Sequence, residues 1–144
     1  MRIISGLNKG KKLIMPEDKT TRPLKDMAKE SIFNILTHAN YVNFHLKNSK
    51  VLDLFSGIGS FGLECISRGS KFVFFLENYP PVLKILKNNI SNLKYESKSK
   101  VINIDAFKID SSTFKEGQKF QIIFCDPPFK EKKIELLIEK IIEM

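Results

Sequence analysis

The stretch GIGSFG, residues 57–62, sets three glycines in the pattern G-x-G-x-x-G directly after the apolar run KVLDLF, residues 50–55. Glycine lets a backbone turn sharply and approach a ligand without a clash from Cβ. Glu77 follows twenty residues after Gly57, which is the spacing of a dinucleotide-binding fingerprint. The pattern predicts a strand, a ligand-binding turn and a helix, and it leaves the identity of the ligand open.

Outward from this turn, apolar strands alternate with helical segments. We predict strands over 50–55, 71–77, 100–105 and 119–126, and helices over 24–38, 60–68, 80–93 and 130–143. This alternation predicts an α/β fold with a parallel sheet, and the nearly continuous apolar strands favour helices on both faces. The apolar helix faces are expected at Ala28, Ile32, Ile35 and Leu36 in the first helix, and at Ile134, Leu137, Ile138 and Ile141 in the last.

The composition is that of one globular domain of 144 residues. No apolar run approaches the roughly 18 residues that span a membrane, and the N-terminus lacks the apolar region of a secretory signal. We therefore expect a cytoplasmic protein. Cys65 and Cys125 lie far apart without a CxxC motif, so they are expected to be buried free thiols. His38 and His45 have no nearby partner in the sequence, and no metal is expected.

Positive charge is concentrated at the beginning of the chain. Residues 1–50 carry ten Lys and Arg against four Asp and Glu, whereas residues 51–144 carry fourteen against twelve. A basic N-terminal third favours a polyanionic partner, most plausibly nucleic acid, although a generally lysine-rich surface would give the same count. We predict a β-hairpin over residues 1–15, and the candidate phosphate-binding residues are Lys9, Lys11, Lys12 and Arg22.

Acidic residues lie at the ends of the four predicted strands, namely Asp53, Glu77, Asp105 and Asp126. In a parallel α/β sheet, ligands bind beyond the carboxyl ends of the strands. A carboxylate at Asp53, four residues before Gly57, disfavours a pyrophosphate but suits a cationic ligand. S-adenosylmethionine, which has a sulfonium, an amino group and no phosphate, therefore fits better than NAD. Glu77 could accept hydrogen bonds from the ribose of either ligand.

The motif DPPF, residues 126–129, follows the fourth predicted strand. Two consecutive prolines restrict the loop and offer no backbone N–H. The carboxylate of Asp126 and the carbonyl of Pro127 can then accept hydrogen bonds from an exocyclic base amine, while Phe129 stacks on the extruded base. The motif thus predicts methylation of a base amine, with no metal and no covalent enzyme intermediate.

Together these segments resemble a known family. VLDLFSGIGSFGLE (51–64) and DPPF resemble motifs of class I methyltransferases. The segments MRIISGLNKGKKL, TRPLKDMAKESIFNIL and FQIIFCDPPF follow in the order seen in the bacterial 16S ribosomal RNA guanine-N2 methyltransferase family. The resemblance covers essentially the whole chain. It implies a Rossmann-like methyltransferase sheet, mainly parallel and in three α/β/α layers, with S-adenosylmethionine as cofactor and 16S ribosomal RNA, free or in the small ribosomal subunit, as substrate.

The resemblance also implies roles for single residues. Asp53, Gly57 and Gly59 would line the methionine end of the cofactor, Glu77 would hold the ribose, and Asp105 and Ala106 would lie by the adenine. Further cofactor-binding candidates beside them are Phe55 and Asn78. The catalytic loop would be Asp126, Pro127, Pro128 and Phe129, and the basic start with Arg22 would face RNA.

The chain departs from the family pattern in three ways. Phe129 stands where the family commonly has Tyr, and Leu24 stands where it usually has Thr. The family sheet has more strands than the four predicted here, so we expect a C-terminally truncated chain. We expect a single domain over 1–144, with a basic extension at 1–48 and a cofactor-binding core at 49–144. The alternatives are a non-catalytic RNA-binding module, a DNA adenine amino-methyltransferase and, more distantly, an NAD oxidoreductase.

Overall fold

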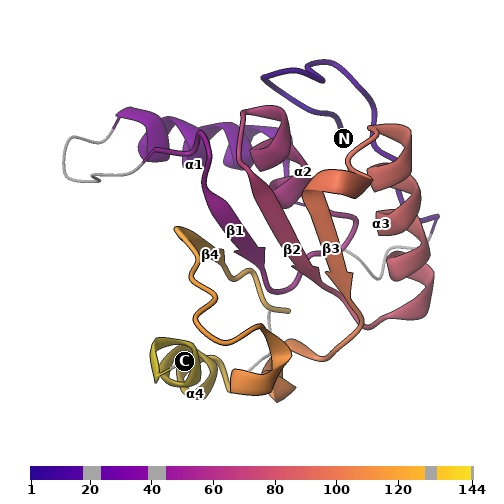
Figure 1. Ribbon diagram of the computed structural model, residues 1–144. Helices are drawn as coiled ribbons and strands as arrows, with labels where there is room; N and C mark the ends of the chain where they lie inside the picture. Colours follow the sequence, from indigo (N-terminus) through magenta and orange to yellow (C-terminus); the bar gives the residue numbers. More distant parts are fainter. Residues whose placement is uncertain (18–23, 39–44, 129–132, 144) are drawn as a thin grey trace.

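In a computed structural model, the chain forms a four-stranded parallel sheet with the order β3-β2-β1-β4 (Figure 1). The structure describes residues 1–17, 24–38, 45–128 and 133–143. The strands are β1 (Lys50–Asp53), β2 (Phe72–Leu76), β3 (Ser99–Ile102) and β4 (Ile122–Phe124). The predicted α/β class and parallel sheet are confirmed. Each strand is shorter than predicted, because the apolar runs continue beyond the residues that pair.

Four helices and three short 3₁₀ turns connect these strands in the described part of the chain. The helices are α1 (Asp26–His38), α2 (Ser60–Ser67), α3 (Pro80–Asn92) and α4 (Ile134–Glu143). The 3₁₀ turns are η1 (Glu96–Lys98), η2 (Ala106–Lys108) and η3 (Ser111–Thr113). Proline begins α3, and Gly69, at φ 105°, follows the end of α2, where glycine commonly stops a helix.

The two faces of the sheet are covered differently. One core joins Val51, Val73 and Phe75 of the sheet to α1, α2 and α3. The opposite face, with Leu52 and Leu76, packs on the crossover between β3 and β4 and on α4. The prediction of helices on both faces is therefore only partly right, since much of the second face is covered by an irregular segment. The first two crossovers lie on one face and the third on the other, which places β4 on the far side of β1.

The apolar residues of α1 predicted its buried face only in part. Ile32 and Leu36 pack against the core as expected. Lys29 and Phe33 are fully buried, whereas Ala28 is exposed and Ile35 is 54% exposed. The prediction missed Lys29 because a lysine does not count as a core residue in an apolar pattern. In helix α4, Leu137 is buried and Ile134 and Ile141 pack against the core as predicted, whereas Ile138 is 47% exposed. No described helix is long and apolar enough to cross a membrane.

Lys29 can be buried because Glu64 of α2, which is also fully buried, provides a partner. The two charged groups lie 3.5 Å apart, and Arg68 Nε donates to Glu64 Oε1 at 2.7 Å. The carboxylate also accepts the backbone N–H groups of Ile4 and Ser5, at 2.8 and 2.9 Å. Burial lowers the pKa of Lys29, while Glu64 and Asp26 oppose that shift. Glu64 thereby ties the start of the chain to α1 and α2.

The arms of the predicted N-terminal β-hairpin are joined by backbone hydrogen bonds, from Ile3 N–H to the Lys11 carbonyl at 2.9 Å, from Gly10 N–H to the Ile3 carbonyl at 2.8 Å and from Leu13 N–H to the Met1 carbonyl at 3.1 Å. The two arms meet in one isolated antiparallel bridge, Arg2 to Lys12, rather than in two strands. A turn joins the two arms, and Gly10 in it has φ 84°. Gly6 lies against the end of α2, where a Cβ would come within 1.9 Å of the Ser67 carbonyl oxygen. We call residues 1–15 the N-terminal segment.

Glu64→Gln is expected to lower the free energy of unfolding by about 3 kcal/mol, because removing one partner of a buried ion pair leaves the other charge uncompensated. Glutamine would also place an N–H donor opposite the N–H groups that now donate to the Glu64 carboxylate. Urea unfolding followed by circular dichroism measures the change. Glu30→Gln, on the exposed side of α1, is the matched control and should change stability by less than about 0.5 kcal/mol. Equal midpoints for the two variants would contradict this account.

Candidate methyl-donor site

The carboxyl ends of β1 and β4 lie side by side at the point where the strand order reverses, which is where open α/β sheets form a ligand-binding crevice. Asp53 pairs with Phe124, and the N–H of Leu54 donates to the carbonyl of Phe124 at 3.0 Å. Asp126 therefore lies two residues beyond the partner of Asp53. Ligands of open α/β sheets bind at such a reversal, outside the carboxyl ends of the strands. The structure thus brings the glycine loop and the DPPF motif to the same crevice.

The glycine loop, residues 56–59, is fixed by hydrogen bonds to the ends of β1 and β2. Ser56 Oγ donates to the carbonyls of Asp53 and Leu76, at 2.8 and 3.0 Å. Gly57 N–H donates to Glu77 Oε2 at 2.9 Å. Gly59 has φ 87°, and a Cβ there would lie 2.6 Å from Leu86 Cδ1. The loop therefore requires glycine at position 59, and its backbone stays close to the crevice.

Glu77 lies beside this loop, as the spacing predicted. Besides Gly57, its carboxylate accepts the N–H groups of Asn78 at 2.9 Å and Tyr79 at 2.8 Å. A carboxylate offers about four acceptor positions, so these three bonds orient the group and leave room for a hydroxyl donor. Glu77 is only partly buried, and it remains accessible to a ligand. This arrangement fits a ribose.

Asp53 is a buried carboxylate with an unused oxygen. It is 1% exposed, and its Oδ2 accepts the N–H of Gly62 in α2 at 3.1 Å. Its Oδ1 has no hydrogen-bond partner among the described residues. Burial raises the pKa of Asp53 to about 7, and the charges of Asp126 and Glu77 add to the rise. A buried acceptor of this kind suits a cationic N–H donor, which is what the amino group of S-adenosylmethionine would supply.

A second set of residues lies beyond β3, on the other side of the glycine loop. Asp105 Oδ1 accepts the N–H of Phe107 at 3.0 Å, and Ala106 is buried. The ring of Phe55 lies 5.2 Å from that of Phe107, centroid to centroid. The structure thus joins three predicted residues to Phe107, which the sequence reasoning missed. An aromatic residue directly after Asp105-Ala106 was the available signal, since a planar ring suits a flat base.

We call the DPPF motif, residues 126–129, the acceptor loop. Its described residues are more exposed to solvent than Asp53. Asp126 and Pro128 are exposed and Pro127 is partly buried, while Phe129 lies outside the described residues. Cys125, next to Asp126, is half-buried rather than fully buried as expected, and burial with the charges of Asp126 and Asp53 raises the pKa of its thiol. Cys65 is fully buried, as predicted. Neither thiol is favoured as a nucleophile.

The basic residues of the N-terminal segment lie away from the acceptor loop. Lys9, Lys11 and Lys12 are exposed, and Arg22 lies outside the described residues. The turn that carries Lys9 contacts Ser67, because the N–H of Leu7 donates to the Ser67 carbonyl at 2.8 Å. Ser67 ends α2, so the turn is at the amino edge of the sheet, opposite the arrowheads in Figure 1. In the described part of the chain, no group of His, Cys, Asp and Glu is placed to hold a metal ion.

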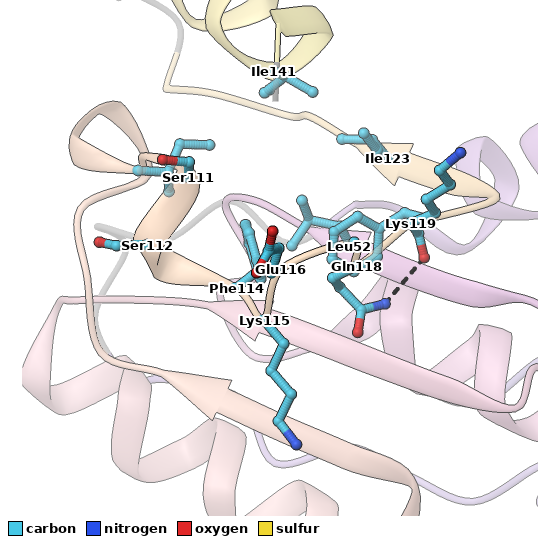
Figure 2. Close-up of a pocket in the computed structure, with 13 residues that line it drawn as sticks. Leu52, Ser111, Ser112, Phe114, Lys115, Glu116, Gln118, Lys119, Ile123 and Ile141 are labelled. Atoms are coloured by element: carbon cyan, nitrogen blue, oxygen red, sulfur yellow. Dashed lines mark hydrogen bonds between the residues drawn. The ribbon is translucent and has the colours of Figure 1, made fainter.

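A separate groove of about 750 Å³ lies on the sheet face that α4 covers. Figure 2 shows its lining, in which Leu52, Ile123 and Ile141 supply apolar surface and Gln118 donates to the Lys119 carbonyl at 3.0 Å. None of the predicted site residues lines this groove. It brings together no catalytic or ligand-orienting set.

Comparison with known proteins matches this chain to a family. The family model described as Conserved hypothetical protein 95 matches residues 1–144. The ribosomal RNA small subunit methyltransferase D of Haemophilus influenzae is 37% identical over 144 residues, covering 96% of this chain and 71% of that protein. The Escherichia coli protein of the same name is 32% identical over 135 residues, covering 94% of this chain and 63% of that protein.

Solved structures agree with this assignment. The structure of the Escherichia coli protein yhhF superposes with a TM-score of 0.80 at 29% identity, covering 99% of this chain and 72% of that one. A second structure, from Haemophilus influenzae, gives a TM-score of 0.71 at 36% identity. The sequence resemblance to the bacterial small-subunit ribosomal RNA methyltransferases is confirmed, and the chain belongs to the family that the Conserved hypothetical protein 95 model describes.

Proposed function

We propose that this chain transfers a methyl group from S-adenosylmethionine to the exocyclic N2 amine of a guanine in 16S ribosomal RNA. The observation that carries the proposal is the pairing of β1 with β4, which sets the buried carboxylate of Asp53 and the acceptors of Asp126 and Pro127 at one crevice. The relatives named as small-subunit ribosomal RNA methyltransferases support the RNA substrate. In this proposal residues 1–48 are the RNA-facing extension and residues 49–144 the cofactor-binding core of a single domain.

The residues that would hold S-adenosylmethionine fall into groups according to the part of the cofactor that each would contact. Asp53 would accept its amino group, Gly57 and Gly59 would allow the backbone to approach, and Glu77 with Asn78 would hold the ribose. Asp105, Ala106, Phe55 and Phe107 would surround the adenine. When bound, the cofactor supplies an electrophilic methyl group on a sulfonium.

The acceptor loop would orient the exocyclic amine of the base for attack on the methyl group. The lone pair of an exocyclic amine is delocalised into the base and is a weak nucleophile. The Asp126 carboxylate and the Pro127 carbonyl would each accept a hydrogen bond from one of its two N–H groups. These hydrogen bonds would orient the amine and favour a pyramidal nitrogen. The proton released after methyl transfer would go to Asp126 or to water. Phe129 would stack on the base.

Asp126→Ala is expected to reduce methyl transfer to 16S ribosomal RNA by at least about 100-fold, because the amine loses its carboxylate acceptor. The affinity for S-adenosylhomocysteine should change less than about threefold, because Asp126 is exposed and outside the glycine loop. Transfer of labelled methyl groups measures the first quantity and calorimetry the second. Asp110→Ala, at an exposed position in the third crossover, is the control.

The same assay tests the assignment itself. Nucleoside analysis of the product should show N2-methylguanosine. A methylated adenine in DNA would instead support the amino-methyltransferase alternative. Binding of cofactor and RNA without turnover would support a non-catalytic RNA-binding module, and binding of NAD in place of S-adenosylhomocysteine would overturn the proposal.

Binding of S-adenosylhomocysteine should strengthen as pH rises through the pKa of Asp53, which is about 7 in the free protein. The ligand amino group favours the ionised carboxylate, so binding expels a proton where Asp53 is protonated. Between about pH 6 and pH 8 the ionised fraction grows about tenfold, and the affinity should grow with it. Calorimetry in buffers of different ionisation enthalpy measures both effects. Asp53→Asn should bind more weakly and without this pH dependence, whereas Asp110→Asn should keep it; a flat wild-type profile would contradict the role of Asp53.

Charge reversal of Lys9, Lys11 and Lys12 should weaken RNA binding and reduce its salt dependence, because each lost phosphate contact removes about 0.7 to 0.9 from the slope of log K against log salt. Affinity for S-adenosylhomocysteine should survive in the absence of RNA. Reversal of Lys87, Lys100 and Lys115, which are exposed outside the N-terminal segment, matches the change in net charge. If both triple variants lose RNA affinity equally, the segment has no specific role and the effect is one of overall charge.

A further inference from the structure

Two buried side chains join the N-terminal segment to the residues on either side of Gly59. The first is Asn89 of α3, which is 1% exposed. Its Nδ2 donates to the carbonyl of Ile58 at 3.1 Å and to that of Ile14 at 3.2 Å. Its Oδ1 accepts the N–H of Ile14 at 2.7 Å. One amide group therefore binds the glycine loop and one arm of the N-terminal segment.

The second side chain is Lys29 of α1, on the other side of Gly59. Its Nζ donates to Ser60 Oγ at 3.3 Å and to the carbonyl of Arg2 at 2.8 Å. Ser60 is the first residue of α2, and Arg2 forms the antiparallel bridge with Lys12. The other arm of the segment is thus bonded to the residue that follows Gly59.

Burial makes both connections stiff. Lys29 is fully buried and Asn89 nearly so, so water cannot replace a partner that moves away. A buried polar group that loses its partner costs about 1–3 kcal/mol, and more when it is charged. Movement of the N-terminal segment away from α2 and α3 would therefore break bonds to Ile58 and Ser60 at the same time.

We propose that Asn89 and Lys29 are positioning residues that couple the N-terminal segment to the glycine loop, so that RNA held by the segment and cofactor held by the loop strengthen each other's binding. This inference rests on the proposed function, because it takes RNA as the ligand of the segment and S-adenosylmethionine as the ligand of the loop. Because the two elements share these buried bonds, a ligand that restrains the motion of one element also restrains the other, so the second ligand binds with a smaller loss of conformational freedom.

The coupling is measured by titrating S-adenosylhomocysteine into the full chain with and without a 16S ribosomal RNA transcript. In the wild type, RNA should tighten S-adenosylhomocysteine binding by about fivefold or more, and the ligand should tighten RNA binding by the same factor. Asn89→Asp removes both N–H donors and turns an oxygen toward the carbonyls of Ile14 and Ile58. The coupling factor should then fall close to one. Asn88→Asp makes the same chemical change at the neighbouring, exposed position of α3 and should keep the wild-type factor.

Two further measurements keep the proposal testable if Asn89→Asp does not fold. Ser60→Ala removes a single acceptor of Lys29 and should reduce the coupling factor without changing the circular dichroism spectrum. In the unaltered chain, S-adenosylhomocysteine alone should slow hydrogen exchange at the N–H of Ile14, which lies in the segment and bonds to Asn89. No change in exchange at Ile14 would overturn the inference.

The outcomes separate this inference from the proposed function. Binding of both ligands with a coupling factor of one in the wild type overturns the inference and leaves the methyltransferase proposal standing. A factor that is equal in Asn89→Asp and Asn88→Asp overturns the role of Asn89. Failure of the wild type to bind S-adenosylhomocysteine overturns the proposed function and the inference with it.

Discussion

The pairing of β4 with the free side of β1 is the constraint on which the site depends. Helix α2, which follows β1, packs on one face of the sheet, and α4, which follows β4, packs on the other. The carboxyl ends of β1 and β4 cannot be closed by one connecting segment, and a crevice remains. Asp53 and Asp126 reach it from adjacent strands. A different strand order would leave the same two motifs intact in the sequence and separate them in space.

Two buried acids, Glu64 and Asp53, differ in how far hydrogen bonds and ion pairs compensate for their burial. The carboxylate of Glu64 accepts two backbone N–H groups and pairs with Arg68 and Lys29, so its burial is compensated. Asp53 is buried to the same degree but has one bond and an unused oxygen, and its pKa rises to about 7. Functional sites commonly retain buried groups that lack a hydrogen-bond partner, because a bound ligand supplies that partner. The unsatisfied acid is thus at the crevice, and the satisfied one is beneath the N-terminal segment.

The sequence predicted the features that local patterns govern and missed those that distant pairs govern. Apolar runs located all four strands, and the glycine spacing located Glu77 beside Gly57. The prediction for α1 missed the burial of Lys29, because Lys29 is stabilised by Glu64, which lies 35 residues away in the chain. Asn89 forms a hydrogen bond with Ile14, which lies 75 residues away in the chain. Neither Asn89 nor Ile14 belongs to a recognisable sequence motif. The hairpin arms do bond to each other, but their pairing extends to a single antiparallel bridge, and Glu64 and Asn89 of the helices hold further backbone groups of the same arms.

The placement of the basic turn constrains how RNA could be engaged. The turn lies at the amino edge of the sheet, and the acceptor loop lies at the carboxyl edge. An eight-residue helix such as α2 rises about 12 Å, so a single nucleotide cannot reach both places. Lysines of the turn would hold phosphates several nucleotides from the methylated base, and such contacts position the RNA without reading its sequence. Buried bonds through Asn89 and Lys29 are then the route by which a distant phosphate contact reaches the glycine loop.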